Sequence, residues 1–555
     1  MKIFKGNGIS SGICFGRLYF FKRKEQIIER RHIGSVEREL KRYEEASEQA
    51  VACLRDLYDQ ALQDLGEPEA MIFRVHEMML KDEGFIQGIK SIIKTERVNA
   101  EFAVEQTANH YISIFRNMEN AYMRNRAADM RDISEKLISK LLDTDSENFS
   151  QIKEPMIIVA DDLLPSEIVQ LDKEGILGFA LLQGSTNSHA AILARTMSVP
   201  TVVGLQGQLT EDCDGKEAVI DAFAGAVYLD PDPITLEKMQ GLRAEFRRHL
   251  ESMEALKGKE NVTRDGRTIR INANIGSLQD VAHVLQNDAG GIGLFRSEFL
   301  YLDGNDYPTE EMQFETYKAV LSQMKGKKVI IRTMDIGADK QVDYFGLPHE
   351  ENPAMGFRAI RICLQRPQLF KTQLRALFRA SVYGRLGIMF PMIISVEEVR
   401  RIKEIIEEVK TELAQRSLPF SEYVELGIMI ETPAAAIVSD DLAKEVDFLS
   451  IGTNDLIQYT LAVDRQNQEL EKYYNLHHKA VLRLIRRVVK NGHQYGAWVG
   501  VCGELGADTA MTETFLAMGV DELSVAPPKV LEVRSKVRES DVEKVAKGIL
   551  RAIGE

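Results

Sequence analysis

Eight apolar, β-rich segments recur along about the last 300 residues, and this repetition constrains the fold more than any other feature of the chain. The segments between them carry apolar residues at helical spacing, as in Val396–Leu413 and His478–Asn491. Eight alternating strand and helix units are typical of a (β/α)8 TIM barrel, which we expect over residues 261–555. The predicted strands are Ile269–Ile275, Gly291–Arg296, Val329–Ile336, Leu386–Ile393, Leu426–Glu431, Phe448–Gly452, Trp498–Cys502 and Leu523–Val525.

The region before the barrel predicts a small α/β domain made of residues 1–22 and 146–230. Residues 1–20 alternate in polarity and contain several glycines, which predicts a short strand and hairpin that join the sheet of this domain. Further strands are predicted at Met156–Ala160, Gly178–Leu182, Thr201–Val203, Ala218–Asp221 and Ala226–Leu229. The whole chain is therefore expected to be a multidomain α/β protein.

A helical subdomain over residues 23–145 is expected to interrupt this α/β domain. Apolar residues recur at helical spacing from Val36 to about Leu65, and further helices are predicted at 68–81, 98–118 and 127–142. The subdomain is thus a bundle of roughly four helices. After the break at Asp230–Pro233, a charged helix from Thr235 to Lys257 predicts a linker over residues 231–260.

Composition excludes several classes of function. The net charge of −14 disfavours a nucleic-acid or anionic-membrane binder and is compatible with docking a basic protein. The five cysteines form no CxxC pair, so neither a disulfide framework nor a structural zinc site is expected, which fits a reducing cytoplasm. The amino terminus lacks the apolar segment of a signal peptide, and no run reaches the length of a membrane span. We therefore expect a cytoplasmic protein with no membrane insertion.

The stretch Gly184–Arg195 follows an apolar, strand-like run and then reads as a helix from about His189. Ser188 is a good N-cap residue, which places His189 in the first turn of that helix. Unpaired backbone N–H groups and the helix dipole favour a phosphoryl group there, and a neutral imidazole is a competent nucleophile. The alternative is a histidine that only caps or packs.

The ends of the predicted barrel strands carry polar residues, and in TIM barrels the chemistry lies at these ends. Glu431 and Asp455, from neighbouring strands, offer hard oxygen ligands for Mg²⁺, with substrate oxygens and waters completing the octahedron. Cys502 is either a buried structural thiol or a proton donor to a carbanion-like carbon. Four arginines are candidates to bind phosphate or carboxylate oxygens: Arg296, Arg332, Arg358 and Arg465. A rim salt bridge is the alternative for any one of them, but cations at several strand ends favour an anionic ligand.

The stretch Gly184–Arg195, followed by Val199–Gly204, resembles the phosphohistidine segment of the phosphoenolpyruvate-utilising enzymes. With the helical insertion and the strand-end segments, the likeness is specifically to the Enzyme I family of the sugar phosphotransferase system, and it covers essentially the whole chain. Residues 126–133 are similar to the start of the last helix of the Enzyme I bundle, which docks the phosphocarrier protein HPr.

This resemblance implies a set of roles. His189 takes the phosphoryl group of phosphoenolpyruvate and passes it to a histidine of HPr, while Cys502 protonates the enolpyruvate. Mg²⁺ is held by Glu431 and Asp455. The enzyme is a homodimer through its barrel, and the histidine domain swings between barrel and bundle. Phosphoenolpyruvate binds at Arg296, Arg332, Asn454 and Arg465, with Asp455 and Arg358 also facing the substrate.

The chain departs from the family pattern near His189. The family commonly has Thr where this chain has Asn187, and it favours hydroxyl residues where Leu164 and Ile168 stand. These departures concern how His189 is oriented and tuned, because the missing hydroxyls are candidate partners of the imidazole or its loop.

Four other readings compete with this one. A dikinase or synthase needs a nucleotide-binding domain for which we expect no room, and no GxxxxGK[ST] motif occurs. A nitrogen-system paralogue normally carries an additional sensory domain, which we do not expect here. A non-catalytic phosphoenolpyruvate-sensing scaffold needs neither His189 nor Cys502. A TIM-barrel lyase explains the rim but leaves the first 230 residues without a role.

Overall fold

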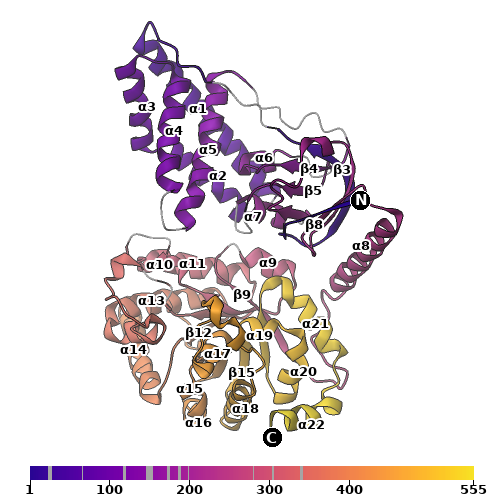
Figure 1. Ribbon diagram of the computed structural model, residues 1–555. Coiled ribbons are helices and arrows are strands. Elements are labelled where there is room, and N and C mark those ends of the chain that lie inside the picture. The colour runs from indigo at the N-terminus through magenta and orange to yellow at the C-terminus, as the bar shows by residue number, and fades with distance from the viewer. Residues whose placement is uncertain are drawn as a thin grey trace. The chain divides into compact units, whose positions relative to one another are not determined.

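The computed structural model divides into two compact units, Met1–Leu250 and Glu251–Glu555, each with its own apolar cores (Figure 1). It describes residues 1–22, 28–64, 67–116, 121–144, 154–171, 175–184, 189–197, 199–278, 280–302, 306–337, 340 and 342–554. At some positions within helices, His189 among them, it describes the backbone alone. Within these ranges, no helix combines the length and apolar character needed to pass through a bilayer.

Five helices in the described part of the first unit pack around one apolar core to form a bundle (Figure 1). They are α1 (Val36–Asp64), α2 (Glu67–Leu80), α3 (Glu83–Glu96), α4 (Ala100–Arg116) and α5 (Ala121–Leu141). The prediction of about four helices was wrong, because it missed α3. This helix has clear local signals: the Asp82 side chain caps it by accepting the Phe85 N–H, and Phe85, Ile89 and Ile93 form one buried face.

The α/β part of the first unit contains an eight-stranded sheet among the described residues, in the order β1-β8-β7-β3-β4-β5-β6-β2. The strands are β1 (Lys2–Lys5), β2 (Asn7–Gly8), β3 (Ile13–Phe20), β4 (Met156–Ala160), β5 (Ile176–Leu181), β6 (Thr201–Val203), β7 (Glu217–Asp221) and β8 (Ala226–Leu229). The predicted amino-terminal hairpin is wrong, because β1 pairs with β8, β2 with β6, and β3 with β4 and β7. The alternating pattern identified strands that join the sheet, but strand partners are set by contacts far apart in sequence.

Two short helices, α6 (Pro165–Val169) and α7 (His189–Thr196), pack on this sheet. Ile168 of α6 and Ala191 of α7 belong to the same apolar cluster as Phe179 of β5. α7 begins at His189, as predicted, whereas the predicted N-cap Ser188 lies outside the described residues.

The helix α8 (Pro233–Glu254) confirms the predicted charged helix near Thr235–Lys257. Its Met239 packs on Ile13 and Val219 of the sheet, and the Arg243 guanidinium lies 4.5 Å from the centre of the Phe15 ring. The boundary between the two units falls within α8, between Leu250 and Glu251.

The second unit contains a closed barrel of eight parallel strands, which confirms the predicted (β/α)8 fold (Figure 1). Its strands are β9 (Arg270–Ile275), β10 (Ile292–Arg296), β11 (Val329–Arg332), β12 (Leu386–Phe390), β13 (Glu425–Ile430), β14 (Phe448–Gly452), β15 (Trp498–Cys502) and β16 (Glu522–Val525). The strands predicted to end at Ile336 and Ile393 are shorter than expected. β12 stops before Met392, which has a φ of 56° that does not continue a strand.

Helices surround the barrel and bury its outer face in one large apolar core. The helices between or after the strands are α9 (Asp280–Gln286), α10 (Phe299–Leu302), α11 (Glu310–Gln323), α12 (Ile360–Gln365), α13 (Pro367–Ala380), α14 (Val396–Gln415), α15 (Pro433–Ile437), α16 (Ser439–Leu442), α17 (Thr453–Leu461), α18 (Lys479–Gln494), α19 (Glu504–Ala507), α20 (Thr509–Met518), α21 (Val530–Glu539) and α22 (Val542–Ile553). Inside the barrel, Phe448 and Trp498 stack with ring centres 4.7 Å apart.

Candidate active site

The carboxyl ends of the eight parallel strands meet at one mouth of the barrel, and most of the predicted site residues of the second unit lie there. Arg296, Arg332 and Cys502 are the last residues of β10, β11 and β15. Glu431 directly follows β13, and Asp455 lies in the first turn of α17, directly after β14. The barrel thus brings together side chains that are far apart along the chain.

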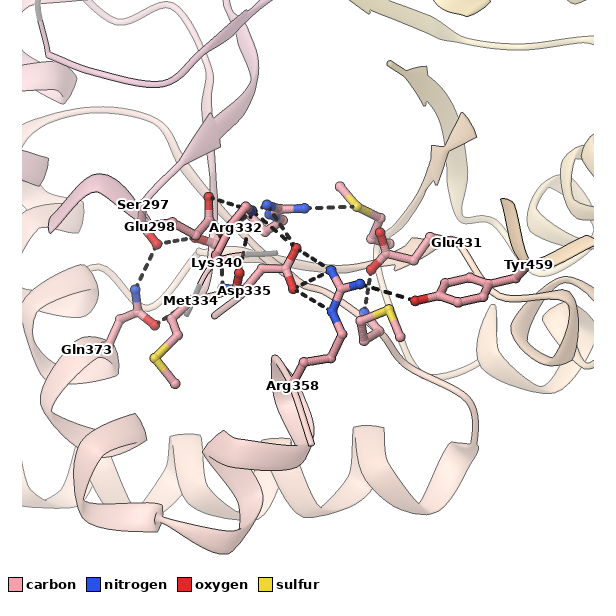
Figure 2. A network of polar contacts seen from close by, with 12 residues as sticks. Ser297, Glu298, Arg332, Met334, Asp335, Lys340, Arg358, Gln373, Glu431 and Tyr459 are labelled. Carbon is pink, nitrogen blue, oxygen red and sulfur yellow. Dashed lines mark hydrogen bonds and ion pairs between the residues drawn. The ribbon is translucent and has the colours of Figure 1, made fainter. Parts of the chain in front are cut away.

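Arg332 is buried, and two carboxylates hold its guanidinium (Figure 2). One Nη atom lies 2.9 Å from Glu298 Oε1 and 3.2 Å from Asp335 Oδ2, and the other donates to Met429 Sδ at 3.6 Å. Arg332 Nε is buried and has no hydrogen-bond partner among the described residues. A buried donor without a partner is costly, so this edge of the guanidinium is suited to a ligand oxygen.

Arg358 lies beside Arg332 and shares Asp335 with it (Figure 2). Its Nη2 donates to both Asp335 carboxylate oxygens at 2.8 and 3.0 Å, and its Nη1 donates to the Tyr459 hydroxyl at 3.1 Å. Gly337 makes this approach possible, because a Cβ there would lie 2.5 Å from the Arg358 Cβ and the glycine has a φ of +113°. Arg358 is thereby fixed from both sides of the barrel mouth.

Both arginines therefore form salt bridges, which the sequence analysis had treated as the alternative to ligand binding. The ion-pair partners of Arg332 and Arg358 were not predicted, because Glu298 and Asp335 had not been selected as site residues. These pairs are buried rather than exposed at the surface. The sequence did contain a signal, since both acids follow a strand-end arginine by two or three residues.

The charges of this cluster shift the pKa values of Arg332, Arg358 and Asp335 toward their ionised forms. Burial opposes the charge of Arg332 and of Arg358, but the surrounding carboxylates, Asp335 among them, outweigh it and raise the pKa of both guanidinium groups. Burial also opposes the charge of Asp335, yet Arg332, Arg358 and Lys340 lower the pKa of its carboxyl well below the usual range. Lys340 Nζ lies 3.7 Å from both Asp335 Oδ2 and Glu298 Oε2.

Glu431 is fully buried, and only one of its two carboxylate oxygens accepts a hydrogen bond from the described residues (Figure 2). Its Oε1 accepts the Met392 N–H at 2.5 Å, whereas its Oε2 has no hydrogen-bond partner among the described residues. Burial, followed by the charges of Asp455 and Asp335, raises the pKa of the Glu431 carboxyl. A buried carboxylate oxygen that faces other acids and lacks a donor is suited to a cation.

The donor set fits Mg²⁺ rather than a cation held by the protein alone. In the part of the chain that the structure describes, no group of three His, Cys, Asp or Glu side chains is placed to hold a metal. Mg²⁺ usually takes one or two carboxylates and completes its octahedron with substrate oxygens and waters. Glu431 and Asp455 are such a pair of carboxylates.

Cys502 lies at the barrel mouth with its thiol facing the interior cluster that contains Met389 and Met429. Ser450 Oγ lies 3.6 Å from Cys502 Sγ, which itself lies 3.5 Å from the Ile451 carbonyl oxygen. Burial raises the pKa of the Cys502 thiol to about 11. The thiol is therefore protonated at neutral pH and carries a proton that it can give up.

Asn454 lies next to Asp455 in the first turn of α17. Asn454 Oδ1 accepts the Glu504 N–H at 3.2 Å, and its NH₂ group donates no hydrogen bond to the described residues. This contact requires Gly503, which has a φ of +103° and whose Cβ would lie 3.0 Å from Asn454 Oδ1. Arg465 follows α17, and its side chain is exposed.

His189 belongs to the first unit, so the structure does not place it relative to the barrel. It is the first residue of α7, and its side chain, Asn187 and Ser188 lie outside what the structure describes. The family departures at Leu164 and Ile168 are both buried in α6 or at its N-cap. The Leu164 N–H donates to Glu167 Oε2 at 2.7 Å. This backbone group at the N-terminus of α6 thus has a hydrogen-bond partner without a hydroxyl side chain at position 164.

The bundle contributes a buried polar group next to α6. His76 Nε2 lies 3.3 Å from Asp129 Oδ1, and Ser166 of α6 donates its N–H and its hydroxyl to Asp132 at 3.2 and 2.5 Å. Arg126 donates to Asp129 at 3.1 Å. The tract 126–133 is thus partly a buried junction between bundle and α/β domain rather than only a solvated face.

Three family models match the chain, and all three describe phosphoenolpyruvate-utilising enzymes. The model of the phosphoenolpyruvate-binding domain matches residues 251–542, the model of the N-terminal domain matches residues 5–126, and the model of the mobile domain matches residues 152–225.

Curated relatives match along almost the whole chain. A phosphoenolpyruvate-protein phosphotransferase of Geobacillus stearothermophilus is 43% identical over 546 residues, covering 98% of this chain and 94% of that protein. One from Bacillus sp. (strain S) is 42% identical with the same coverage. Among solved structures, that of an Enzyme I protein, nEIt, is 32% identical, with a TM-score of 0.38 over 44% of this chain and 99% of that chain.

Proposed function

Because the chain belongs to the phosphoenolpyruvate-utilising enzymes, and within them to the phosphoenolpyruvate-protein phosphotransferases, we propose that it transfers the phosphoryl group of phosphoenolpyruvate to its own His189. The group then passes to a histidine of HPr, and pyruvate is released, as the first step of sugar uptake by the phosphotransferase system. The observation that supports this most directly is the barrel mouth, which brings together buried arginines, a carboxylate with one oxygen unpaired and a protonated thiol.

The substrate has two anionic groups, and the mouth has cations for both. Arg332 offers a buried Nε without a partner, and Arg358 is held in one orientation by Asp335 and Tyr459. The proposed substrate contacts are Arg296, Arg332, Arg358, Asn454, Asp455 and Arg465. Pre-positioned donors of this kind stabilise the charge that develops on the transferring group without having to reorganise.

Glu431 and Asp455 are the proposed ligands of Mg²⁺, which when bound supplies Lewis-acid stabilisation of the phosphoryl oxygens. The half-satisfied carboxylate of Glu431 supports this assignment. The Met392 N–H holds the Glu431 carboxylate in place through its other oxygen.

The transfer step breaks the bond between phosphorus and the enol oxygen and forms one between phosphorus and the His189 imidazole. The enolate that leaves takes a proton on carbon to become pyruvate, and we assign this proton to Cys502. A thiol whose pKa is raised to about 11 retains its proton until a strong base such as an enolate forms beside it.

The relay needs His189 to meet both the barrel and HPr, so we propose four parts, of which the histidine domain swings between the barrel and the bundle. These are the phosphohistidine domain (residues 1–22 and 146–230), the HPr-binding bundle (23–145), the linker helix (231–260) and the barrel (261–555), through which two copies form a homodimer. The five unpaired cysteines support a cytoplasmic location.

Intact-mass analysis after incubation with phosphoenolpyruvate and Mg²⁺ tests this function. We expect the wild-type chain to gain one acid-labile phosphoryl group, the His189→Ala variant to gain none, and HPr to remove the group from the wild type. A chain that binds phosphoenolpyruvate but gains no mass would instead support the non-catalytic sensing scaffold.

A further inference from the structure

Gln373 of α13 is a buried side chain that contacts two strand-end segments of the barrel mouth at once (Figure 2). Its Oε1 accepts the Met334 N–H at 3.0 Å. Its Nε2 donates to Ser297 Oγ at 3.0 Å and to the Tyr317 hydroxyl at 3.1 Å. Since a backbone N–H can only donate, Oε1 must face Met334, and the amide orientation is determined.

Ser297 carries this contact on to Arg332. The Ser297 hydroxyl donates to the Arg332 carbonyl oxygen at 2.7 Å, and its own oxygen receives the Gln373 amide. Gln373 therefore holds the backbone of Arg332 on one side through Ser297 and on the other side through Met334. The backbone that carries the buried Arg332 side chain is therefore held at two points, the Arg332 carbonyl oxygen and the Met334 N–H.

Beyond Tyr317, the hydrogen bonds that start at Gln373 lead away from the barrel mouth. The Tyr317 hydroxyl donates to Gln313 Oε1 at 3.2 Å, and Gln313 Nε2 donates to the Pro308 carbonyl oxygen at 3.1 Å. Gln313 is as fully buried as Gln373 and also bonds Tyr317, but its hydrogen bonds to the described residues stay with α10, α11 and the loop before α11. The chain therefore provides a matched control for Gln373.

We propose that Gln373 is a positioning residue for phosphoryl transfer, which fixes the direction from which Arg332 presents its guanidinium to phosphoenolpyruvate. This inference rests on the proposed function. A displacement of a substrate-positioning group by about 1 Å can lower a rate by about 100-fold, and the position of the Arg332 side chain follows that of its backbone.

The test compares Gln373→Leu with Gln313→Leu in the full-length chain, at saturating phosphoenolpyruvate and Mg²⁺. We expect the rate of phosphorylation to fall by about 10- to 100-fold in Gln373→Leu and to stay within about threefold of wild type in Gln313→Leu. The fluorescence of Trp498, the only tryptophan, reports whether each barrel is folded. Equal losses in both variants, or an unchanged rate in Gln373→Leu, would overturn the inference.

A double-mutant cycle with Ser297→Ala separates positioning from general destabilisation. Because one of the two links from Gln373 to the Arg332 segment runs through Ser297, the losses of the two single variants should combine in the double variant to less than their product. Losses that multiply would place the action of Gln373 elsewhere and reject the proposal.

Ser297→Ala also serves alone if Gln373→Leu does not fold, because it deletes the one hydroxyl that joins Gln373 to the Arg332 carbonyl oxygen and leaves the Met334 contact in place. The proposal requires this link, so a wild-type rate in Ser297→Ala rejects it. A wild-type chain that takes up no phosphoryl group would refute the proposed function and this inference together. A phosphorylated wild type with an unaffected Gln373→Leu would refute this inference alone.

Discussion

At the scale of single residues, the barrel mouth is a balance of buried charges. Asp335 neutralises Arg332 and Arg358, and Glu298 shares Arg332 with it. Glu431 is left without a hydrogen-bonding cation among the described residues, and Met392 holds it with a backbone N–H from a strained φ of 56°. The arginines are thus oriented before substrate arrives, and the Glu431 carboxylate is suited to Mg²⁺.

This balance of buried charges predicts that Asp335→Asn strongly destabilises the barrel. Removing this carboxylate leaves two buried guanidinium groups short of a partner, which should lower the free energy of unfolding of the barrel by about 3–5 kcal/mol. Urea unfolding followed by Trp498 fluorescence measures it. The exposed pair Asp441–Lys444 is the control, since Asp441→Asn should change nothing measurable. Equal effects of the two variants would show that the buried network does not stabilise the barrel.

At the scale of elements, one carboxylate ties two helices of the bundle together. Glu77 of α2 is nearly buried, and it accepts from Arg55 of α1 at 2.7 Å and from Lys81 at 2.7 Å. These hydrogen bonds, that of Arg55 first, lower the pKa of the Glu77 carboxyl to about 2. The junction of α1 and α2 therefore depends on a charged side chain as well as on apolar packing.

This contact predicts a stability difference that depends on pH. The folded pKa lies below the unfolded value of about 4.3, so the stabilisation is present above that pH and is lost as the pH falls toward 2. Glu77→Gln should cost about 1–2 kcal/mol at pH 7 and progressively less below pH 4. Thermal unfolding followed by circular dichroism at several pH values measures this.

The matched control is Glu48→Gln on the exposed face of α1, for which the described residues offer no ion pair. It should leave stability unchanged at every pH. A Glu77→Gln effect that stays constant down to pH 3 would contradict the assigned role of the charge.

At the scale of the whole molecule, the two units have separate apolar cores. The barrel core and the clusters of the first unit share no residue, and Trp498 lies inside the barrel, stacked on Phe448. Each unit is expected to unfold cooperatively as its own core becomes exposed to water. The fluorescence of the single tryptophan should therefore report on the barrel alone.

Two separate unfolding transitions are the expected outcome in urea. Circular dichroism should register both units, whereas Trp498 fluorescence should follow only the transition of the barrel. Asp335→Asn should shift that transition and leave the other in place. If both signals changed together at one urea concentration in wild type and variant, the units would be coupled and this prediction would be wrong.

The sequence by itself determined the repeating elements and the types of residue at their ends. Helical and strand periodicity located all eight barrel strands, and the rule that parallel strands end at one rim brought Arg332, Glu431 and Cys502 together. These features could be predicted because periodicity and strand ends are local properties of the chain.

Only the tertiary structure decided which groups pair. Gln373 meets Ser297 across 76 residues, so no local pattern predicts this contact. The position of Glu298 after a strand-end arginine marks it as a candidate, but its pairing with Arg332 spans 34 residues and needs the fold. The partners of β1 were mispredicted for the same reason, since β1 pairs with the distant β8. Hydrogen bonds and ion pairs depend on distance in space, which the fold sets only when all of its elements are packed.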